Sequence, residues 1–293
     1  MRVLFTGVSS FTGLWFAREL ILAGHEVVAP TRGGIGTYDP LRAARMALLP
    51  RTCRVVPECP FGSEAFLGLV GQGGWDILCH HAADATNYRS RDFDMFAALS
   101  GNARGLDTVL GRLVEGGCRK VVLTGSYFEA GEGAGSEPLV AFSPYGLSKT
   151  LTSTAFASVV VWHGLSYGKF VIANPFGRME EPRFTRYLVN CWKQGQTARV
   201  ATPAYVRDNV PVDLLAKAYR RFVEELPDTP GSRHLGPCGY IESQGAFAGR
   251  FAREIGPRLG LATPPRTGGT DDVSRAFFPI QHPRSGCPGL GLG

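Results

Sequence analysis

The chain has 293 residues, of which 44% are hydrophobic and 19% charged, and its formal net charge at pH 7 is +6. This length and balance suit a globular chain with one large core, or one core and a smaller lobe, and exclude a disordered protein. The positive charge suits an anionic ligand, but the arginines are dispersed, which argues against a nucleic-acid partner.

Targeting and metal signals are weak throughout the chain. No apolar run approaches the roughly 18 residues that a membrane-spanning helix needs. The first apolar run, Val3–Phe5, is too short for a signal-peptide core. The seven cysteines are scattered, without a Cys-x-x-Cys pair, which predicts free thiols. We therefore expect a cytoplasmic protein with no membrane partner and no metal site.

Short apolar segments alternate with longer periodic segments along the first two thirds of the chain. Strands that are apolar throughout and separated by helices are typical of a parallel sheet covered on both faces, so the expected fold class is α/β. The predicted strands are residues 2–7, 26–31, 53–58, 75–83, 119–126 and 168–177, and the predicted helices are residues 11–23, 91–113, 183–194, 212–225 and one that contains Tyr145.

The first predicted strand leads directly into the turn TGVSSFTG, residues 6–13. Glycine lets the chain bend sharply there, and the free N–H groups at the start of the next helix can bind a phosphate. An ordinary strand–helix turn is the alternative interpretation. After the first strand of an α/β chain, however, the pattern favours a dinucleotide site, with contacts expected from Gly7, Ser9, Ser10, Phe11 and Gly13.

A tyrosine and a lysine lie four residues apart in SPYGLSKT, residues 143–150. On a helix, Tyr145 and Lys149 would share one face, and the cation would lower the pKa of the tyrosine from about 10. Tyr145 could then donate and accept a proton near neutral pH. The spacing alone is weak evidence, because such a pair can arise by chance on a helix surface.

Ser126 ends the fifth predicted strand. Open α/β sheets bind their ligands at the carboxyl edge, where this hydroxyl would lie. It could donate a hydrogen bond to a substrate oxygen as charge develops there. A plain strand-end hydroxyl is the alternative.

These motifs, in this order, resemble the extended short-chain dehydrogenases/reductases of the NAD-dependent epimerase/dehydratase family. The first turn is similar to the family's TGxxGxxG, with Ser10 in place of the middle glycine. The other similar segments are HHAA at residues 80–83, SGNARG with Asn102, LTGS ending at Ser126, Tyr145 and Lys149 as YxxxK, ANPFG at residues 173–177 and VRDNVPVD at residues 206–213. The resemblance covers residues 1–225.

The resemblance implies a Rossmann-type doubly wound parallel sheet in residues 1–176, which would bind the dinucleotide. A smaller substrate-binding lobe would occupy residues 177–293 and be partly interleaved with the first domain. It also implies a homodimer in which helix 91–113 and the Tyr145 helix pack against their mates. From Leu261 the chain is rich in glycine and proline, and we expect this tail to be poorly ordered.

The resemblance also assigns roles to individual residues. Tyr145 would transfer the proton, Ser126 would hydrogen-bond the reacting oxygen, and Lys149 would hold the charge and bind ribose hydroxyls. Further positions implied are Ala82 and Asn102 beside the cofactor, and Asn174 and Arg207 beside the diphosphate of a nucleotide sugar.

The choice of cofactor depends on the end of the second strand. A carboxylate there would bind the ribose 2′-hydroxyl of NAD. The chain has Thr31 and Arg32 instead, and arginine suits the 2′-phosphate of NADP. We therefore favour NADP over NAD, with a solvated loop arginine as the alternative interpretation.

The expected reaction follows from what the chain lacks. Family dehydratases carry an Asp-Glu pair after the catalytic hydroxyl, where this chain has Tyr127 and Phe128. Hydride transfer at C4 of a nucleotide sugar through a 4-keto sugar is therefore expected, by an epimerase or a keto-reductase. Pro175 and Pro211 replace Val and His of the family pattern and alter the pocket. A non-catalytic NADP-binding regulatory or interaction module on the same fold is the alternative.

Overall fold

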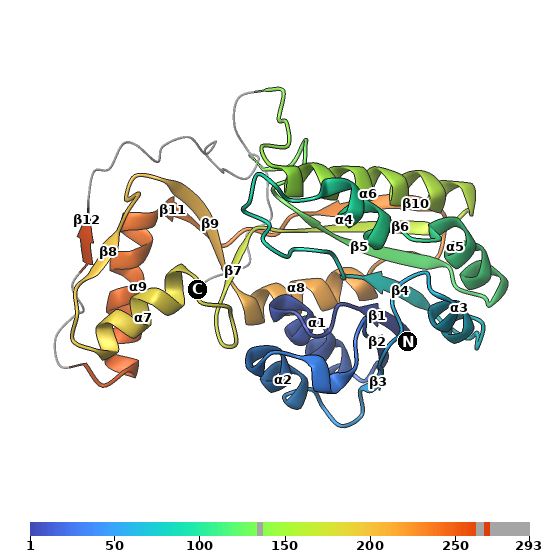
Figure 1. Ribbon diagram of the computed structural model, residues 1–293, viewed down its shortest axis with the longest axis horizontal. Helices are drawn as coiled ribbons and strands as arrows, with labels where there is room; N and C mark the ends of the chain where they lie inside the picture. The colour runs from blue at the N-terminus through green and yellow to red at the C-terminus, as the bar shows by residue number, and fades with distance from the viewer. Residues whose placement is uncertain (134–136, 262–266, 270–293) are drawn as a thin grey trace.

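The computed structural model describes residues 1–133, 137–261 and 267–269. A parallel sheet of seven strands forms the centre of its larger part, in the order β10-β6-β5-β4-β1-β2-β3 (Figure 1). The order changes direction between β1 and β4, and open α/β sheets bind ligands at such a point. The strands are β1 (Arg2–Thr6), β2 (Glu26–Pro30), β3 (Arg54–Val56), β4 (Ile77–His80), β5 (Lys120–Ser126), β6 (Ser166–Ile172) and β10 (Gly231–Leu235).

Helices cover both faces of this sheet, as the all-apolar strands predict. Successive residues of β1 show why: Val3 and Phe5 pack into the cluster under α1 and α8, whereas Leu4 packs into the cluster under α3, α5 and α6. The helices are α1 (Phe11–Leu22), α2 (Pro40–Ala47), α3 (Glu64–Val70), α4 (Met95–Asn102), α5 (Leu106–Glu115), α6 (Pro144–Trp162) and α8 (Val212–Glu224), with a 3-10 turn at Ile35–Thr37. The α/β doubly wound fold is confirmed.

A smaller unit lies at the other end of the molecule (Figure 1). It contains a three-stranded sheet of β7 (Asn174–Phe176), β9 (Val206–Pro211) and β11 (Tyr240–Ser243). Helices α7 (Phe184–Lys193) and α9 (Gln244–Arg258) pack around a second core with β8 (Ala198–Val200), which pairs with β12 (Thr267–Gly269). Between β9 and β11 the chain returns to the main sheet, where α8 packs on α1 and β10 pairs with β6.

The long helix expected at residues 91–113 is wrong, because the structure has two helices there. Gly105 precedes α5 with φ of 57°, a left-handed conformation that interrupts the helical path. Helix α2 was not predicted, although Asp39 and Pro40 are a start signal: the Asp39 carboxylate accepts from the N–H groups of Leu41 and Arg42. The expectation for the tail after Leu261 falls mostly outside the described residues. No described helix is both long and apolar enough to cross a bilayer.

Candidate active site

The expected catalytic residues meet at the carboxyl edge of the sheet. Ser126 is the last residue of β5, and Tyr145 and Lys149 lie in the first turns of α6. This helix begins sharply because Pro144 occupies its first position and the Ser143 hydroxyl accepts from Gly146 N at 3.0 Å. Local sequence therefore fixes where Tyr145 emerges.

The glycine turn after β1 packs directly against the chain that leaves β4. Gly7 has φ of 83°, and a Cβ there would lie 2.7 Å from the backbone nitrogen of Ala82, so no other residue fits without a shift. Ser10 caps α1: its hydroxyl donates to the Gly7 carbonyl at 2.9 Å and accepts from Gly13 N at 3.1 Å. Serine in place of the middle glycine thus holds the turn together.

His81 forms the centre of a hydrogen-bond network that the sequence reasoning did not foresee. Its Nε2 lies 3.1 Å from the Ser10 hydroxyl and 3.0 Å from that of Thr12, and its Nδ1 lies 2.9 Å from that of Thr124. Burial, and then the Lys149 charge, lower the pKa of His81 to about 3. The ring is therefore neutral at pH 7 and joins α1 to β5.

His80 makes a second buried link between strands and α4. Its Nε2 lies 3.1 Å from the carbonyl of Asn102, so this nitrogen carries the proton. Its Nδ1, 3.1 Å away from the Thr6 hydroxyl, then accepts from it. The Thr6 oxygen accepts in turn from the backbone of His81 and Ala82 at 3.1 and 3.0 Å.

Several groups here fit a dinucleotide. The N-terminus of α1 faces the turn, and helix N-termini favour phosphate. Asn102 is 5% exposed; its Oδ1 accepts from Asp84 N at 2.9 Å, but its Nδ2 has no hydrogen-bond partner among the described residues. A buried donor without a partner costs free energy unless a ligand accepts from it. No group of His, Cys, Asp or Glu in the described chain could hold a metal.

The end of β2 carries the residues expected to choose the cofactor. Thr31 is buried and donates from its hydroxyl to the Gly33 carbonyl at 3.0 Å. Arg32 is exposed, and within the described part of the chain it has no ion pair. The Arg32 guanidinium is thus available to an anion, whereas the Thr31 hydroxyl is already bonded within the loop.

Tyr145 and Lys149 do not interact as the sequence suggested. Lys149 is 4% exposed and donates from Nζ to the Thr124 carbonyl at 2.8 Å. Burial raises the pKa of Tyr145, and the Glu129 charge raises it further, while Arg183 lowers it. The expectation that Lys149 lowers the pKa of Tyr145 is therefore wrong for this structure.

Aromatic rings surround the half-buried Tyr145 side chain. The Tyr145 ring meets Tyr88, Phe93 and Phe128 edge to face, at centroid distances of 5.5, 5.7 and 5.9 Å. These rings replace water around the phenol, so they disfavour the phenolate. The neutral phenol is the resting form of Tyr145 in this structure.

Glu129, which the sequence reasoning overlooked, lies behind Ser126. Its Oε1 accepts from the Ser126 backbone at 2.7 Å, and its Oε2 lies 2.7 Å from Nζ of Lys169 on β6. The Ser126 hydroxyl accepts from Phe128 N at 3.3 Å and keeps its own proton to donate. The signal was present as the acidic residue in SYFEAG, but its partner lies forty residues further on.

The expected substrate residues lie on neighbouring strands of the small sheet. In the register of β7 and β9, Asn174 is opposite Asn209 and donates to its Oδ1 at 2.6 Å. The Arg207 guanidinium lies 5.1 Å from the Tyr205 ring, and its buried Nε has no hydrogen-bond partner in the part of the chain described. Asn174 and Arg207 therefore lie on neighbouring strands, and Arg207 Nε is a donor without a partner among the described residues.

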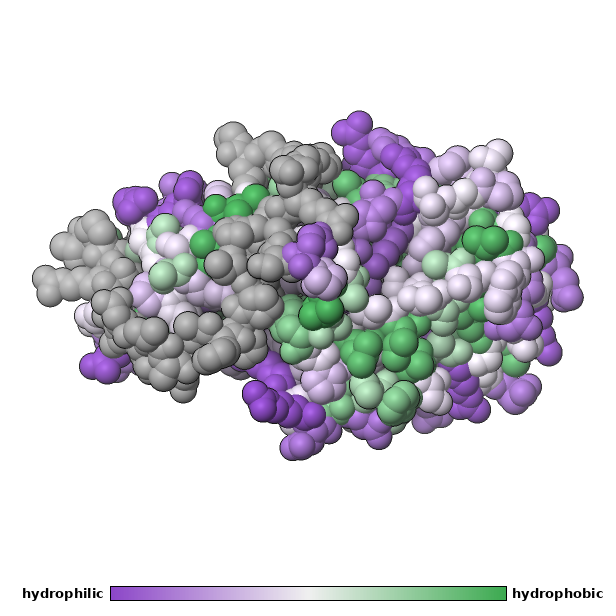
Figure 2. Space-filling view, turned by 90° about the horizontal axis from the view of Figure 1, so that it is seen from above, coloured by the Kyte–Doolittle hydropathy of each residue, from purple (hydrophilic) through white to green (hydrophobic). Residues whose placement is uncertain are grey.

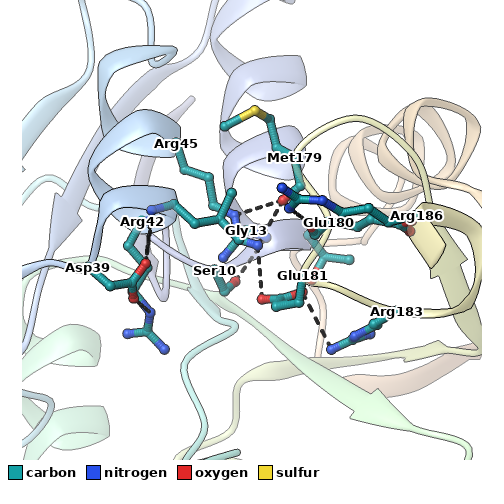
Figure 3. Close-up of polar contacts among 12 residues, drawn as sticks. Ser10, Gly13, Asp39, Arg42, Arg45, Met179, Glu180, Glu181, Arg183 and Arg186 are labelled. Carbon is teal, nitrogen blue, oxygen red and sulfur yellow. Dashed lines mark hydrogen bonds and ion pairs between the residues drawn. The ribbon is translucent and has the colours of Figure 1, made fainter. Parts of the chain in front are cut away.

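An arginine of α2 holds the loop that follows β7 (Figure 3). Arg45, only 1% exposed, donates from Nε and Nη2 to the Met179 carbonyl at 3.0 and 2.7 Å and pairs with Glu181 at 2.9 Å. Arg183, at the end of this loop, lies 3.6 Å from Glu181 and 6.0 Å from the Tyr88 ring. The loop thus joins the dinucleotide side to the surroundings of Tyr145.

Comparisons with known proteins agree with this geometry. The sequence matches the NAD dependent epimerase/dehydratase family over residues 3–234. Among curated proteins, none matches the chain. Among solved structures, UDP-glucose 4-epimerase of Thermotoga maritima, with UDP-glucose, is 17% identical with a TM-score of 0.70, covering 97% of this chain and 89% of its own.

Two further structures share the fold. The dTDP-glucose 4,6-dehydratase DesIV of Streptomyces venezuelae, with NAD, is 21% identical with a TM-score of 0.69, covering 97% of this chain and 88% of its own. UDP-glucuronic acid 4-epimerase of Bacillus cereus, with UDP-glucuronic acid and NAD, is 15% identical with a TM-score of 0.72, covering 96% and 88%.

Proposed function

Because the chain belongs to the NAD-dependent epimerase/dehydratase family, we propose that it transfers hydride at C4 of a nucleotide sugar through a 4-keto sugar. The observation that supports the proposal is that Ser126 ends β5, while Tyr145 and Lys149 lie in the first turns of α6, where Lys149 donates to the Thr124 carbonyl of the same strand. An epimerase and a keto-reductase both need this arrangement.

The proposed roles follow from the hydrogen bonds. The nicotinamide supplies the hydride chemistry when it is bound. Ser126 donates its free hydroxyl proton to the sugar oxygen at the reacting carbon. Tyr145, a neutral phenol at pH 7, gives its proton to that oxygen when a keto sugar is reduced. The raised pKa of Tyr145 means that the phenol carries its proton at pH 7, and also that it is a weaker acid than a free tyrosine.

Lys149 and the open donors complete the proposed site. The buried Lys149 ammonium lies one helical turn from Tyr145 and supplies positive charge and hydrogen bonds to ribose hydroxyls. Asn102 Nδ2, without a partner in the described chain, is the proposed donor to the cofactor. Arg207 and Asn174 are proposed to bind the diphosphate, which suits a guanidinium.

We propose NADP as the cofactor, because Arg32 is exposed at the end of β2 with no carboxylate beside it in sequence. Of the three similar structures described above, two contain NAD. The exposed arginine is the feature that favours the phosphorylated form here. We propose that residues 177–293 bind the substrate, together with the carboxyl edge of the sheet in residues 1–176.

A homodimer is also proposed, through α4 and α6. Phe96 on α4 is 66% exposed, and Val161 and Trp162 on α6 are 73% and 74% exposed. Figure 2 looks down on the side where α6 lies in Figure 1 and shows hydrophobic patches on the larger part of the molecule. Sedimentation at micromolar concentration should give a dimer, and Trp162→Glu should give a monomer. A monomeric wild-type chain would contradict the proposal.

The function is tested with NADPH and NADP and a panel of UDP-, GDP-, CDP- and dTDP-linked sugars and keto sugars. Substrates are first chosen by the rise that they cause in melting temperature. Turnover is then followed as nicotinamide absorbance and by separation of the sugar epimers. Turnover of at least one nucleotide sugar is expected. Cofactor binding with no turnover of any sugar would support the non-catalytic module instead.

A further inference from the structure

A buried carboxylate lies where three parts of the site meet. Glu129 is 2% exposed and is bonded to the Ser126 backbone and paired with Lys169 of β6, each at 2.7 Å. The next residue, Ala130, donates from its backbone to the Thr150 hydroxyl of α6 at 2.9 Å. The turn that carries Glu129 is therefore fastened to β5, β6 and the helix of Lys149.

The backbone beneath this carboxylate leaves it no spare room. Gly125 precedes Ser126, and a Cβ there would lie 2.9 Å from Cε of Lys169 and 3.2 Å from Oε1 of Glu129. The Glu129 Oε1 accepts from the Ser126 backbone, and its Oε2, which has no hydrogen-bond partner among the described residues, is paired with Lys169, so the carboxylate acts on neighbouring protein groups. It is therefore not a replacement for the acidic pair of a dehydratase.

The ion pair between Glu129 and Lys169 is part of a larger group of charges with more carboxylates than lysines. Lys169 Nζ also lies 2.9 Å from Glu132, whose carboxylate lies 3.0 Å from Nε2 of His234 on β10. Glu132 alone can neutralise Lys169, which leaves one negative charge in excess. Lys149 is the other buried cation nearby, and no ion pair involves it in the described chain. Glu129 accepts from the backbone N–H of Ser126, and Lys149 donates to the carbonyl of Thr124, two residues earlier on the same strand, so both buried charges are held at the same end of β5.

We propose that Glu129 is a positioning residue of this site: its carboxylate fixes the Ser126 turn and holds the buried Lys149 ammonium in its charged form. The catalytic part of this inference rests on the proposed function. The electrostatic part concerns Lys149 alone and does not require a substrate.

The groups that face Lys149 agree with this assignment. Burial lowers the pKa of Lys149, Glu129 raises it, and Lys169 lowers it again. The neighbouring rings of His80 and His81 carry no charge at pH 7, since the pKa of each is about 3. Glu129 is therefore the group that opposes the loss of the Lys149 proton.

The inference is tested first without any substrate. The chain has only five lysines, so protein labelled at lysine Cε can be titrated by NMR, with Lys149→Arg identifying the signal. In Glu129→Gln the Lys149 signal should titrate at lower pH than in wild type. In Glu132→Gln, the comparison variant that also removes a carboxylate from Lys169, the Lys149 signal should move less than in Glu129→Gln. Equal titration of Lys149 in wild type and Glu129→Gln would overturn the inference.

A second variant shifts the same signal in the opposite direction. Lys169→Met removes a repelling cation and should move the Lys149 titration to higher pH. If Glu129→Gln fails to fold, as judged by circular dichroism, Lys169→Met shows whether the charges of this cluster act on Lys149 at all. No movement in Lys169→Met would then overturn the inference.

The catalytic part is tested with whichever nucleotide sugar the wild type turns over. Glu129→Gln should lower kcat by about tenfold and leave KM within about twofold, as expected when charge and orientation are lost but binding is kept. Glu132→Gln should lower kcat by less than Glu129→Gln does. Wild-type kcat in Glu129→Gln would overturn this part. If wild type turns over no sugar, the proposed function fails, while the titration still decides the role of Glu129.

Discussion

The candidate site has two ends, the glycine turn after β1 and the surroundings of Ser126, and different kinds of interaction hold each of them together. Around the glycine turn, neutral groups bond to one another: His80 and His81 with the hydroxyls of Thr6, Ser10 and Thr12. Around Ser126, charged groups dominate: Glu129, Glu132, Lys149 and Lys169. Thr124 belongs to both, because its hydroxyl contacts His81 and its carbonyl accepts from Lys149.

This difference reflects what each end must do. A helix N-terminus attracts phosphate through partial charges, and an ionised side chain beside it would cancel or distort that field. Neutral imidazoles hold the turn without doing so. Proton transfer instead depends on the equilibrium between charged and neutral forms, which nearby charges set. Neutral hydrogen bonds thus hold the glycine turn, whereas buried charges surround the residues proposed for acid–base chemistry.

The largest expected effect is at the charged end. Tyr145→Phe should lower turnover by about 10²- to 10⁴-fold, because the proton donor is lost, and should leave the dissociation constant of the cofactor nearly unchanged. Lys149→Ala should weaken both turnover and cofactor binding. Steady-state kinetics and cofactor fluorescence measure the two quantities. Tyr88→Phe, in the same ring cluster, is the matched control and should stay active. More than a few per cent of wild-type activity in Tyr145→Phe would refute the proposed proton transfer.

The next effect concerns the anion-binding end. Arg32→Ala should weaken NADPH binding by roughly 10- to 150-fold, since a charge-assisted hydrogen bond contributes about 1.5–3 kcal/mol. NADH has no 2′-phosphate, so its affinity should barely change. Arg42→Ala is the control, because Arg42 is already paired with Asp39 at 3.6 Å. An equal loss for NADPH and NADH would mean that Arg32 only shapes the loop, and the NADP assignment would fail.

A smaller effect, the pH dependence of the free energy of unfolding, tests whether His81 in the network at the glycine turn is neutral. The pKa of His81 is about 3 in the folded chain and about 6.5 when unfolded, so between these values the unfolded state binds more protons. Stability is therefore lost as pH falls below 6.5. From pH 7 to 5 this histidine should account for about 2 kcal/mol of the loss.

The measurement is urea unfolding of wild type and His81→Gln at both pH values. In the variant, the fall in the free energy of unfolding from pH 7 to 5 should be smaller by about 2 kcal/mol, because glutamine does not titrate. An identical fall in both proteins would show that His81 is not held neutral. The contrast between the two ends would then be lost.

Much of the fold was readable from local patterns. The all-apolar strands predicted a sheet covered on both faces, and the strand-to-glycine turn predicted the start of α1. The break before α5 was missed because periodicity continues across it, while the conformation of Gly105 does not show in a pattern. Start signals such as Asp39 and Pro40 were visible but not used.

The site was predictable in its members but not in its contacts. Motif spacing placed Ser126, Tyr145 and Lys149 at one edge. It could not show that Lys149 bonds to the Thr124 carbonyl, or that aromatic rings desolvate Tyr145 and raise its pKa. Arg45 and Met179 are 134 residues apart, and only the folded chain reveals such pairs.

The return of the chain to the main sheet has a consequence for its synthesis. β10 covers the edge of β6 through a register of Gly231 to Leu235 on Ser166 to Phe170. While the ribosome is still adding the small unit, that edge of β6 has no strand beside it. An unpaired strand edge is a template for association with other chains. Nascent chains that stall before residue 231 should therefore depend on chaperones, whereas chains from which residues 231–235 have emerged can pair β10 with that edge.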